Sequence, residues 1–188
     1  MVRDVSEMLL TIGHSTRDID DFVALMRAHE VAAIVDVRRY PGSRRYPWFG
    51  AAPLEDALRR ADIGYEHVEA LGGRRKPNRD SQNDALTNDQ FRGYADHMAT
   101  DEFHRALERL LARARREHVC VMCAEAVPWR CHRSLLSDAA VARGVEVFHI
   151  VGAGPARKHS PTSAAVIAGG EVAYPARPHP GLFDPESR

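Results

Sequence analysis

Short apolar runs alternate along the chain with segments in which apolar residues recur at every third or fourth position. The short runs are typical of buried strands, and the recurrence is typical of helices that pack one face on a core. We predict strands over residues 8–12, 31–37, 65–68, 119–122, 145–151 and 171–174. We predict helices over residues 19–26, 54–61, 91–98, 103–114, 134–141 and 160–168. This order indicates an α/β fold, with a mainly parallel sheet covered by helices on both faces.

The first strand, the helix after it and the second strand fit within about 30 residues, which is the length of a βαβ unit. Its two strands should be parallel, with their carboxyl ends at the same edge of the sheet. His14 and Ser15 follow the first strand, and Asp36 and Arg38 close the second. We expect these residues to meet, with His14 as a general acid or base and the others as ligand-binding residues. A salt bridge of Asp36 to Arg38 or Arg133 is the structural alternative.

Residues 118–136 concentrate more chemically capable side chains than any other window of the chain. A polar turn there leads from a strand to Cys131, His132 and Arg133, which begin the next predicted helix. The first N–H groups of a helix lack intrahelical partners and attract anions, and this position lowers the pKa of a cysteine thiol. We therefore predict Cys131 or Cys123 as a nucleophile, His132 as a proton-transfer group and Arg133 as an anion ligand.

Residues after the other strands extend this predicted anion site. Ser43 and Arg44 follow the second strand, and Gly73 and Arg74 follow the third. The arginines offer forks of donors suited to phosphate or carboxylate, and glycine lets backbone N–H groups approach a ligand closely. Glu125 lies in the turn after the central strand. It is predicted as a base or as a residue that orients His132. A solvated loop carboxylate is its structural alternative.

The length of 188 residues fits one domain, which we place at residues 1–175, followed by a proline-rich tail at 176–188. The formal net charge is zero, so no overall basic field favours nucleic acid or a membrane surface. We expect no membrane partner. Neither a signal peptide nor a long apolar stretch is visible, so we expect a cytoplasmic protein with reduced thiols.

The three cysteines also raise the question of a metal site, because zinc accepts thiolate and imidazole ligands. Seven residues separate Cys123 from Cys131, which matches no standard zinc motif, and neighbouring side chains at a helix start usually point apart. We therefore assign no metal ligand. A structural metal site built on Cys123, Cys131 and His132 is kept as an alternative. Cys120 lies three positions before Cys123, so the two should face opposite sides of their strand.

Three common motifs are absent from the sequence. No G-x-G-x-x-G fingerprint follows the first strand, which argues against a standard dinucleotide site. No G-K-[ST] element and no G-x-S-x-G elbow are present either, which argues against a P-loop NTPase and an α/β-hydrolase. We expect no cofactor.

Four blocks of residues stand in order along the chain. They are Thr11-Ile12-Gly13-His14-Ser15, Asp36-Val37-Arg38 with Pro41 and Ser43-Arg44, Leu71-Gly72-Gly73-Arg74, and Met122-Cys123-Ala124-Glu125 with Cys131-His132-Arg133. In sequence and order these blocks resemble the signature of the domain-of-unknown-function family number 488, over roughly residues 9–175. The resemblance implies a Rossmann-like three-layer α/β sandwich and a bacterial or archaeal cytoplasmic protein, but no particular reaction. Residues 78–89 and the proline-rich end depart from the family's pattern.

Two classes of function fit these patterns. The first is a small α/β enzyme that holds an anionic small molecule, phosphorylated or nucleotide-like, at the Cys-His-Arg helix start. The alternative is a non-catalytic nucleotide- or nucleic-acid-binding module. In that module the same arginines bind phosphate, and Tyr46, Trp48, Phe49 or Trp129 stacks on bases.

Overall fold

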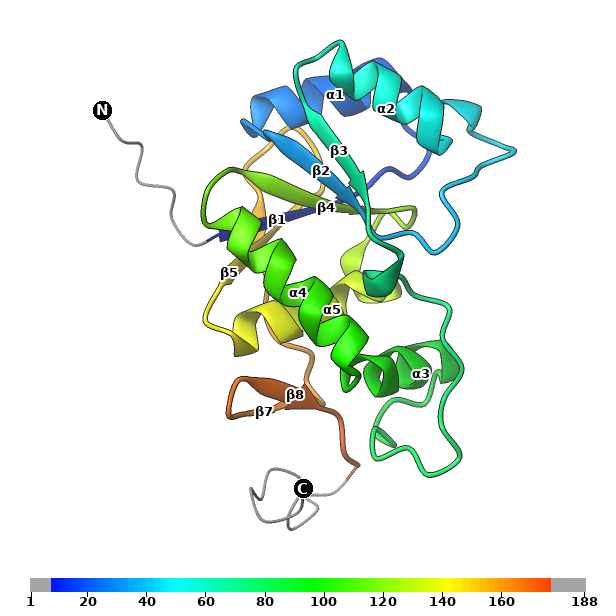
Figure 1. Ribbon diagram of the computed structural model, residues 1–188, viewed down its shortest axis with the longest axis vertical. Coiled ribbons are helices and arrows are strands. Elements are labelled where there is room, and N and C mark those ends of the chain that lie inside the picture. Colours follow the sequence, from blue (N-terminus) through cyan, green and yellow to red (C-terminus); the bar gives the residue numbers. More distant parts are fainter. Residues whose placement is uncertain (1–7, 177–188) are drawn as a thin grey trace.

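A computed structural model describes residues 8–176 and shows a six-stranded sheet between two layers of helices (Figure 1). In sheet order the strands are β3 Gly64–His67, β2 Ala33–Asp36, β4 Val119–Cys123, β1 Met8–Gly13, β5 Glu146–Ile150 and β6 Arg157–Lys158. The helices are α1 Ile19–Ala28, α2 Ala51–Arg59, α3 Asp89–Met98, α4 Asp101–Ala114 and α5 Arg133–Ala142. Strands β1 to β5 are parallel and β6 is antiparallel to β5. The predicted three-layer α/β sandwich is confirmed.

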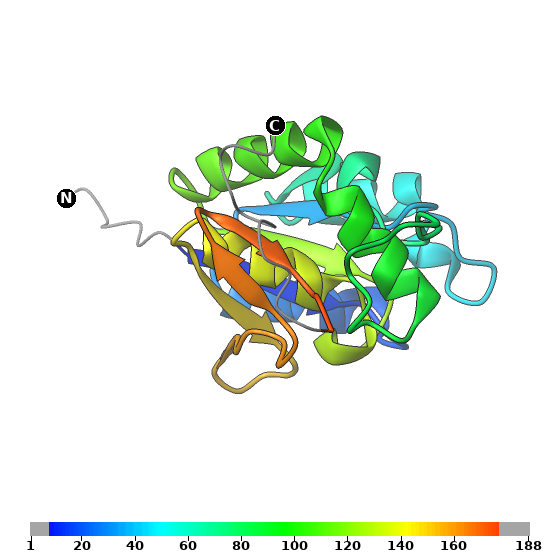
Figure 2. The same ribbon diagram turned by 90° about the horizontal axis from the view of Figure 1, so that it is seen from below.

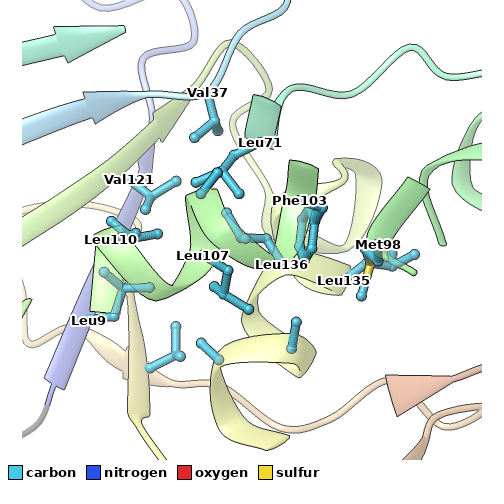
Figure 3. Close-up of a cluster of buried hydrophobic side chains, with 14 of the residues drawn as sticks. Leu9, Val37, Leu71, Met98, Phe103, Leu107, Leu110, Val121, Leu135 and Leu136 are labelled. Atoms are coloured by element: carbon cyan, nitrogen blue, oxygen red, sulfur yellow. The ribbon is translucent and has the colours of Figure 1, made fainter. Parts of the chain in front are cut away.

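Alternate residues of the central strands supply two separate cores. Leu9 and Val121 point to the side covered by α3, α4 and α5, where Figure 3 shows them beside leucines of α4. Leu10 and Cys120 point to the side covered by α1 and α2. Because side chains alternate along a strand, Cys123 falls on the face opposite Cys120, as predicted.

Strand β4 lies between β1 and β2, so the two strands of the predicted βαβ unit are parallel but not adjacent. Both pair with β4: Gly13 is level with Cys123, and Asp36 is level with Met122. The carboxyl ends of β1, β4 and β2 therefore lie side by side. Pockets of open α/β sheets form at this edge, where neighbouring strands lead into different loops.

The prediction of a helix at residues 160–168 is wrong. Its last three residues form strand β7 (Val166–Ala168), which pairs with β8 (Glu171–Ala173) in a hairpin that packs against α5 (Figure 2). Gly169 and Gly170 form the turn, both with positive φ, the backbone conformation that a tight hairpin turn requires. The β-branched residues Val166 and Ile167 favour a strand, and the two glycines favour a hairpin turn. Together they outweigh the weak helical spacing of residues 160–168.

Residues 76–88 form a loop without helix or strand, and α3 holds it in place. The carboxylate of Asp96 accepts hydrogen bonds from the backbone N–H of Asn78 (2.8 Å), the hydroxyl of Ser81 (2.6 Å) and the amide of Asn83 (2.8 Å). This loop lies beside the β8 end of the chain, since the N–H of Ala85 donates to the carbonyl of Tyr174.

The predicted boundary between domain and tail falls at the end of the part that the structure describes. Residues 177–188, which make up nearly all of the proline-rich tail, lie outside it, so the tail stays a prediction. Between residues 8 and 176, no helix combines the length and the apolar character that crossing a membrane requires.

Candidate functional site

A cleft of about 660 Å³ opens at the sheet edge where β1, β2 and β4 end. Most of the residues predicted from the sequence line it. They are His14, Ser15, Arg38, Ser43, Gly73, Arg74, Cys123, Glu125 and His132. Four predicted residues do not line the cleft: Asp36, Arg44, Cys131 and Arg133. The expectation that distant polar blocks meet at one edge thus agrees with the geometry, although the chemical roles stay predictions.

His14 lies beside Cys123 because the loop after β1 continues the hydrogen bonding between β1 and β4. The backbone N–H of His14 donates to the carbonyl of Cys123 at 2.9 Å. A glycine is needed just before, because a Cβ at position 13 would lie only 1.7 Å from the carbonyl oxygen of Glu125. Gly13 therefore allows the loop after β4 to cross directly over the end of β1.

The ring of His14 is held in one tautomer. It stacks on Phe49 at 4.1 Å, and its Nδ1 lies 2.9 Å from the carbonyl oxygen of Ser15. A carbonyl only accepts, so Nδ1 carries the proton and Nε2 keeps its lone pair. Burial, and then the charge of Arg38, lowers the pKa of His14 to about 4, so the ring is neutral at pH 7. His14 can therefore accept a proton or a hydrogen bond.

Asp36 does not line the cleft, but it holds Arg38, which does. Its buried carboxylate accepts hydrogen bonds from Nε (2.9 Å) and Nη2 (2.6 Å) of Arg38 and from the hydroxyl of Tyr65 (2.9 Å). A further N–H of the guanidinium donates to the carbonyl of Phe49 at 2.8 Å. The ion pair that was the structural alternative is thus present, and it fixes Arg38 at the wall of the cleft.

Arg133 points into the protein, away from the cleft. It is only 1% exposed, and its Nη2 donates to the carbonyl of Glu125 at 2.6 Å. Its Nη1 lies 3.4 Å from the hydroxyl of Thr11, and its Nε is buried without a partner within the described residues. Arg133 begins α5 as predicted, but it holds the loop after β4 from inside instead of reaching into the cleft.

Cys123, Cys131 and His132 form a compact group, which we call the Cys-Cys-His cluster. Nδ1 of His132 lies 3.6 Å from Sγ of Cys131 and 4.0 Å from Sγ of Cys123, and all three atoms lie within 4.8 Å of one another. Cys123 and His132 line the cleft, whereas Cys131 lies behind them and is 4% exposed.

The two thiols of the cluster have pKa values shifted in opposite directions. The interaction with Cys123, opposed by burial and helped by the charge of Arg133, lowers the pKa of Cys131 to about 6. The same interaction, with burial, raises the pKa of Cys123 to about 12. The lowered pKa of Cys131 has the direction expected of a thiolate, whereas the pKa of the cleft-lining Cys123 is raised. The chemical roles of both cysteines stay predictions.

The imidazole of His132 occupies space that a side chain at position 73 would fill. A Cβ on Gly73 would lie 2.6 Å from Nδ1 of His132, and the ring of Tyr94 packs on the other side at a centroid distance of 4.8 Å. Nε2 of His132 is buried without a hydrogen-bond partner in the described part of the chain, so the carboxylate of Glu125 does not orient it. Gly73 was predicted to let a ligand approach the backbone closely. In the structure, its missing side chain leaves room for the ring of His132.

Three arginines of the cleft were not predicted: Arg39, Arg45 and Arg130. Arg45 takes the place expected for Arg44, which is exposed and outside the cleft. Arg39 and Arg45 lie in loops and Arg130 ends a short 3₁₀ helix, so no apolar periodicity indicates the direction of these side chains. Their closeness in sequence to the predicted blocks was the one available signal.

The fold and the cleft define an α/β sandwich protein with a ligand-sized pocket at the carboxyl ends of its parallel strands. The chain belongs to the family described as Domain of unknown function DUF488, which matches residues 18–140, from the cap of α1 into α5. That range contains the predicted blocks except the one at residues 11–15. No curated protein and no solved structure matches the chain.

Proposed function

We propose that this protein is a small α/β enzyme that binds an anionic substrate, phosphorylated or nucleotide-like, in the cleft. The observation that carries the proposal is the charge of the lining. Among residues 8–176, five arginines line the cleft, at positions 38, 39, 45, 74 and 130, against a single carboxylate, that of Glu125. A concave surface with such an excess of guanidinium groups favours phosphate or carboxylate groups over neutral ligands.

Most of this positive charge is available to a ligand. Arg38 is neutralised by Asp36, and Nε of Arg39 lies 3.9 Å from a carboxylate oxygen of Glu69. The other three arginines form no salt bridge with any residue between 8 and 176, and Arg45 packs over the ring of Tyr46 at 5.6 Å. These three side chains are exposed, so an entering anion can pair with them without breaking an existing salt bridge.

Groups able to move protons stand next to these donors. His14 offers a free Nε2, Glu125 has an exposed carboxylate at the cleft, and His132 belongs to the Cys-Cys-His cluster. We assign proton transfer to these residues and the reactive centre to the cluster, of which Cys123 faces the cleft. An enzyme is favoured over a plain binding module because binding alone needs neither an imidazole with a free lone pair nor a pair of thiols.

Calorimetric titration with inorganic pyrophosphate tests the anion site. Replacing Arg74 and Arg130 together by alanine should weaken binding at least about tenfold, because each charged hydrogen bond contributes about 1.5–3 kcal/mol. Arg59→Ala is the matched control, because this exposed arginine of α2 is paired with Asp56 away from the cleft. Equal affinity in the double variant and the control would refute the proposal. For substrates found by screening phosphate esters and nucleotides, His132→Ala and Cys131→Ser should abolish turnover.

A nucleic-acid-binding module remains the second candidate, because one exposed aromatic residue stands at the cleft. Tyr40 is 64% exposed, and the guanidinium of Arg39 lies 5.9 Å from its ring centroid. Phe49, which the sequence offered as a stacking residue, is fully buried under His14 and is not available. A module of this kind should bind short oligonucleotides with an affinity that falls steeply as salt rises, and Tyr40→Ala should weaken that binding.

A further inference from the structure

The Cys-Cys-His cluster has contacts that are too long for good hydrogen bonds but suit a shared ion. Its two sulfur–nitrogen distances are 3.6 and 4.0 Å. Around a tetrahedral zinc ion, with bonds of about 2.3 Å to sulfur and about 2.0 Å to nitrogen, ligand atoms stand about 3.5 Å (S to N) and about 3.8 Å (S to S) apart. The three ligand atoms lie within 4.8 Å of one another, so side-chain movements of about 1 Å would bring them to three corners of a tetrahedron.

We propose that Cys123, Cys131 and His132 bind a zinc-type divalent cation through their two Sγ atoms and Nδ1, with the fourth position open to the cleft. Metal binding itself does not depend on the proposed function. Only the catalytic role of the open fourth position rests on the proposal that the protein is an enzyme. The ligand set selects the metal, because thiolate and imidazole favour zinc, whereas magnesium and calcium favour oxygen ligands.

The backbone explains why neighbouring residues converge here, against the expectation from sequence. Cys131 is extended, with φ −137° and ψ 147°, whereas His132 already has helical dihedral angles, φ −54° and ψ −14°. This change of conformation between the two residues brings both side chains to the same ion-sized space. The loop between β4 and α5 then folds back through the short 3₁₀ helix Pro128–Arg130, which brings Cys131 beside Cys123.

The position of the His132 ring is also strictly constrained. Only a residue without a Cβ fits opposite Nδ1, and that residue is Gly73. The ring is held there although its Nε2 is buried without a partner among the described residues. With an ion at Nδ1, the ring proton resides on Nε2, so metal binding selects one tautomer. The arrangement keeps Nδ1 turned towards the two sulfurs.

The open position distinguishes this site from a purely structural one. Within residues 8–176, the cluster includes no fourth cysteine, histidine or carboxylate. Structural zinc sites are normally closed by four protein ligands, whereas three ligands and an open position are typical of catalytic zinc. The open side is the cleft, since Cys123 and His132 line it. An anion held by the arginines would have an oxygen atom within reach of the ion, which would polarise it as a Lewis acid.

Cobalt(II) provides a direct test, because a cobalt–thiolate bond gives a charge-transfer band in the near ultraviolet. Protein prepared without a metal-affinity tag and stripped with a chelator should bind about one equivalent of cobalt with this band, and zinc should displace it. Cys131→Ser and His132→Ala should each weaken zinc binding at least about tenfold in competition with a chromophoric chelator. Far-ultraviolet circular dichroism verifies that each variant is folded, and either folded variant decides the test.

Cys120→Ala is the matched control, because this buried thiol lies on the opposite face of β4. It should retain the full cobalt band. The inference is overturned if the wild-type protein gives no thiolate band, or if the band persists in Cys131→Ser and is lost in Cys120→Ala.

The arginine variants separate this inference from the proposed function. Replacement of Arg74 and Arg130 by alanine should leave cobalt binding unchanged while anion binding falls. Cobalt binding without any arginine-dependent anion binding would refute the enzyme proposal alone. Arginine-dependent anion binding to a protein without the cobalt band would refute the metal site alone.

Discussion

Arg133 lies near two groups of buried polar side chains, which differ in how completely their hydrogen bonds are satisfied. One is a chain of Thr11, His149, His159 and Asp138, which we call the buried histidine network. Successive members are joined at 2.7, 2.9 and 2.7 Å, and every ring nitrogen has a partner. The donors and acceptors of these side chains pair with one another. The network therefore links β1, β5 and α5, which carry Thr11, His149 and Asp138.

The other group is the Cys-Cys-His cluster, whose hydrogen bonds are not fully satisfied within the described residues. Its contacts are 3.6 and 4.0 Å long, and Nε2 of His132 has no partner within residues 8–176. It also opens on the cleft, whereas the buried histidine network does not. Buried polar groups that satisfy one another stabilise a fold, and a group left unsatisfied beside a pocket is where a ligand is expected.

The largest expected effect is on stability, from the loss of Asp138. Its carboxylate accepts from Nε2 of His159 (2.7 Å), the N–H of Thr162 (3.0 Å) and the hydroxyl of Tyr174 (2.8 Å). Asp138→Ala strands these donors, so the free energy of unfolding in urea should fall by about 3–5 kcal/mol. The exposed Asp56→Ala should change it by no more than about 1 kcal/mol. Similar values for the two variants would mean that the network does not stabilise the fold.

A second large effect concerns the framework of the cleft. In Gly13→Ala the new Cβ would meet the backbone carbonyl of Glu125 at 1.7 Å, so the loop after β4 must move. We expect a loss of about 3 kcal/mol or more in the free energy of unfolding, measured by denaturant titration. Gly152→Ala is the control, because no atom of residues 8–176 lies within 4 Å of its added Cβ. A wild-type unfolding midpoint for Gly13→Ala would contradict the close approach of these loops.

The pH dependence of stability tests His149 by comparison with a variant, because the pKa of His14 is lowered over the same range. Burial, followed by the charges of His159 and Arg133, lowers its pKa from 6.5 to about 4. Between these values the unfolded chain binds a proton that the folded protein does not. Stability should therefore fall as pH falls from 6.5 to 4, by up to about 1.4 kcal/mol per pH unit. The slope should be smaller in His149→Gln, and an identical slope would show that His149 does not contribute.

The smallest expected effect is on the stability of the metal-free protein when His132 is replaced. The ring makes only long contacts to sulfur and packs on Tyr94, so His132→Asn should lower the free energy of unfolding by less than about 1 kcal/mol. Denaturant titration in the presence of a chelator measures this change in the free energy of unfolding. A loss as large as that of Asp138→Ala would indicate that the cluster is structural.

The sequence predicted most strands and most helices because burial imposes a period on apolar residues, but it missed the short strands β6 and β7. It brought His14, Arg38 and Cys123 to one edge because parallel strands end together. It did not predict the inward direction of Arg133, which depends on how α5 packs on the sheet. Nor did it predict that Arg45, not Arg44, lines the cleft, since loop conformation decides this.

Histidine-selective nuclear magnetic resonance tests most directly whether the incomplete cluster, and not the satisfied network, meets the ligand. Zinc and then pyrophosphate are added to the metal-free protein while the ring signals are followed. We predict that zinc shifts the signal of His132, and that pyrophosphate shifts that of His14, which lines the same cleft. The signals of His149 and His159 should stay in place. Shifts confined to His149 and His159 would contradict the account.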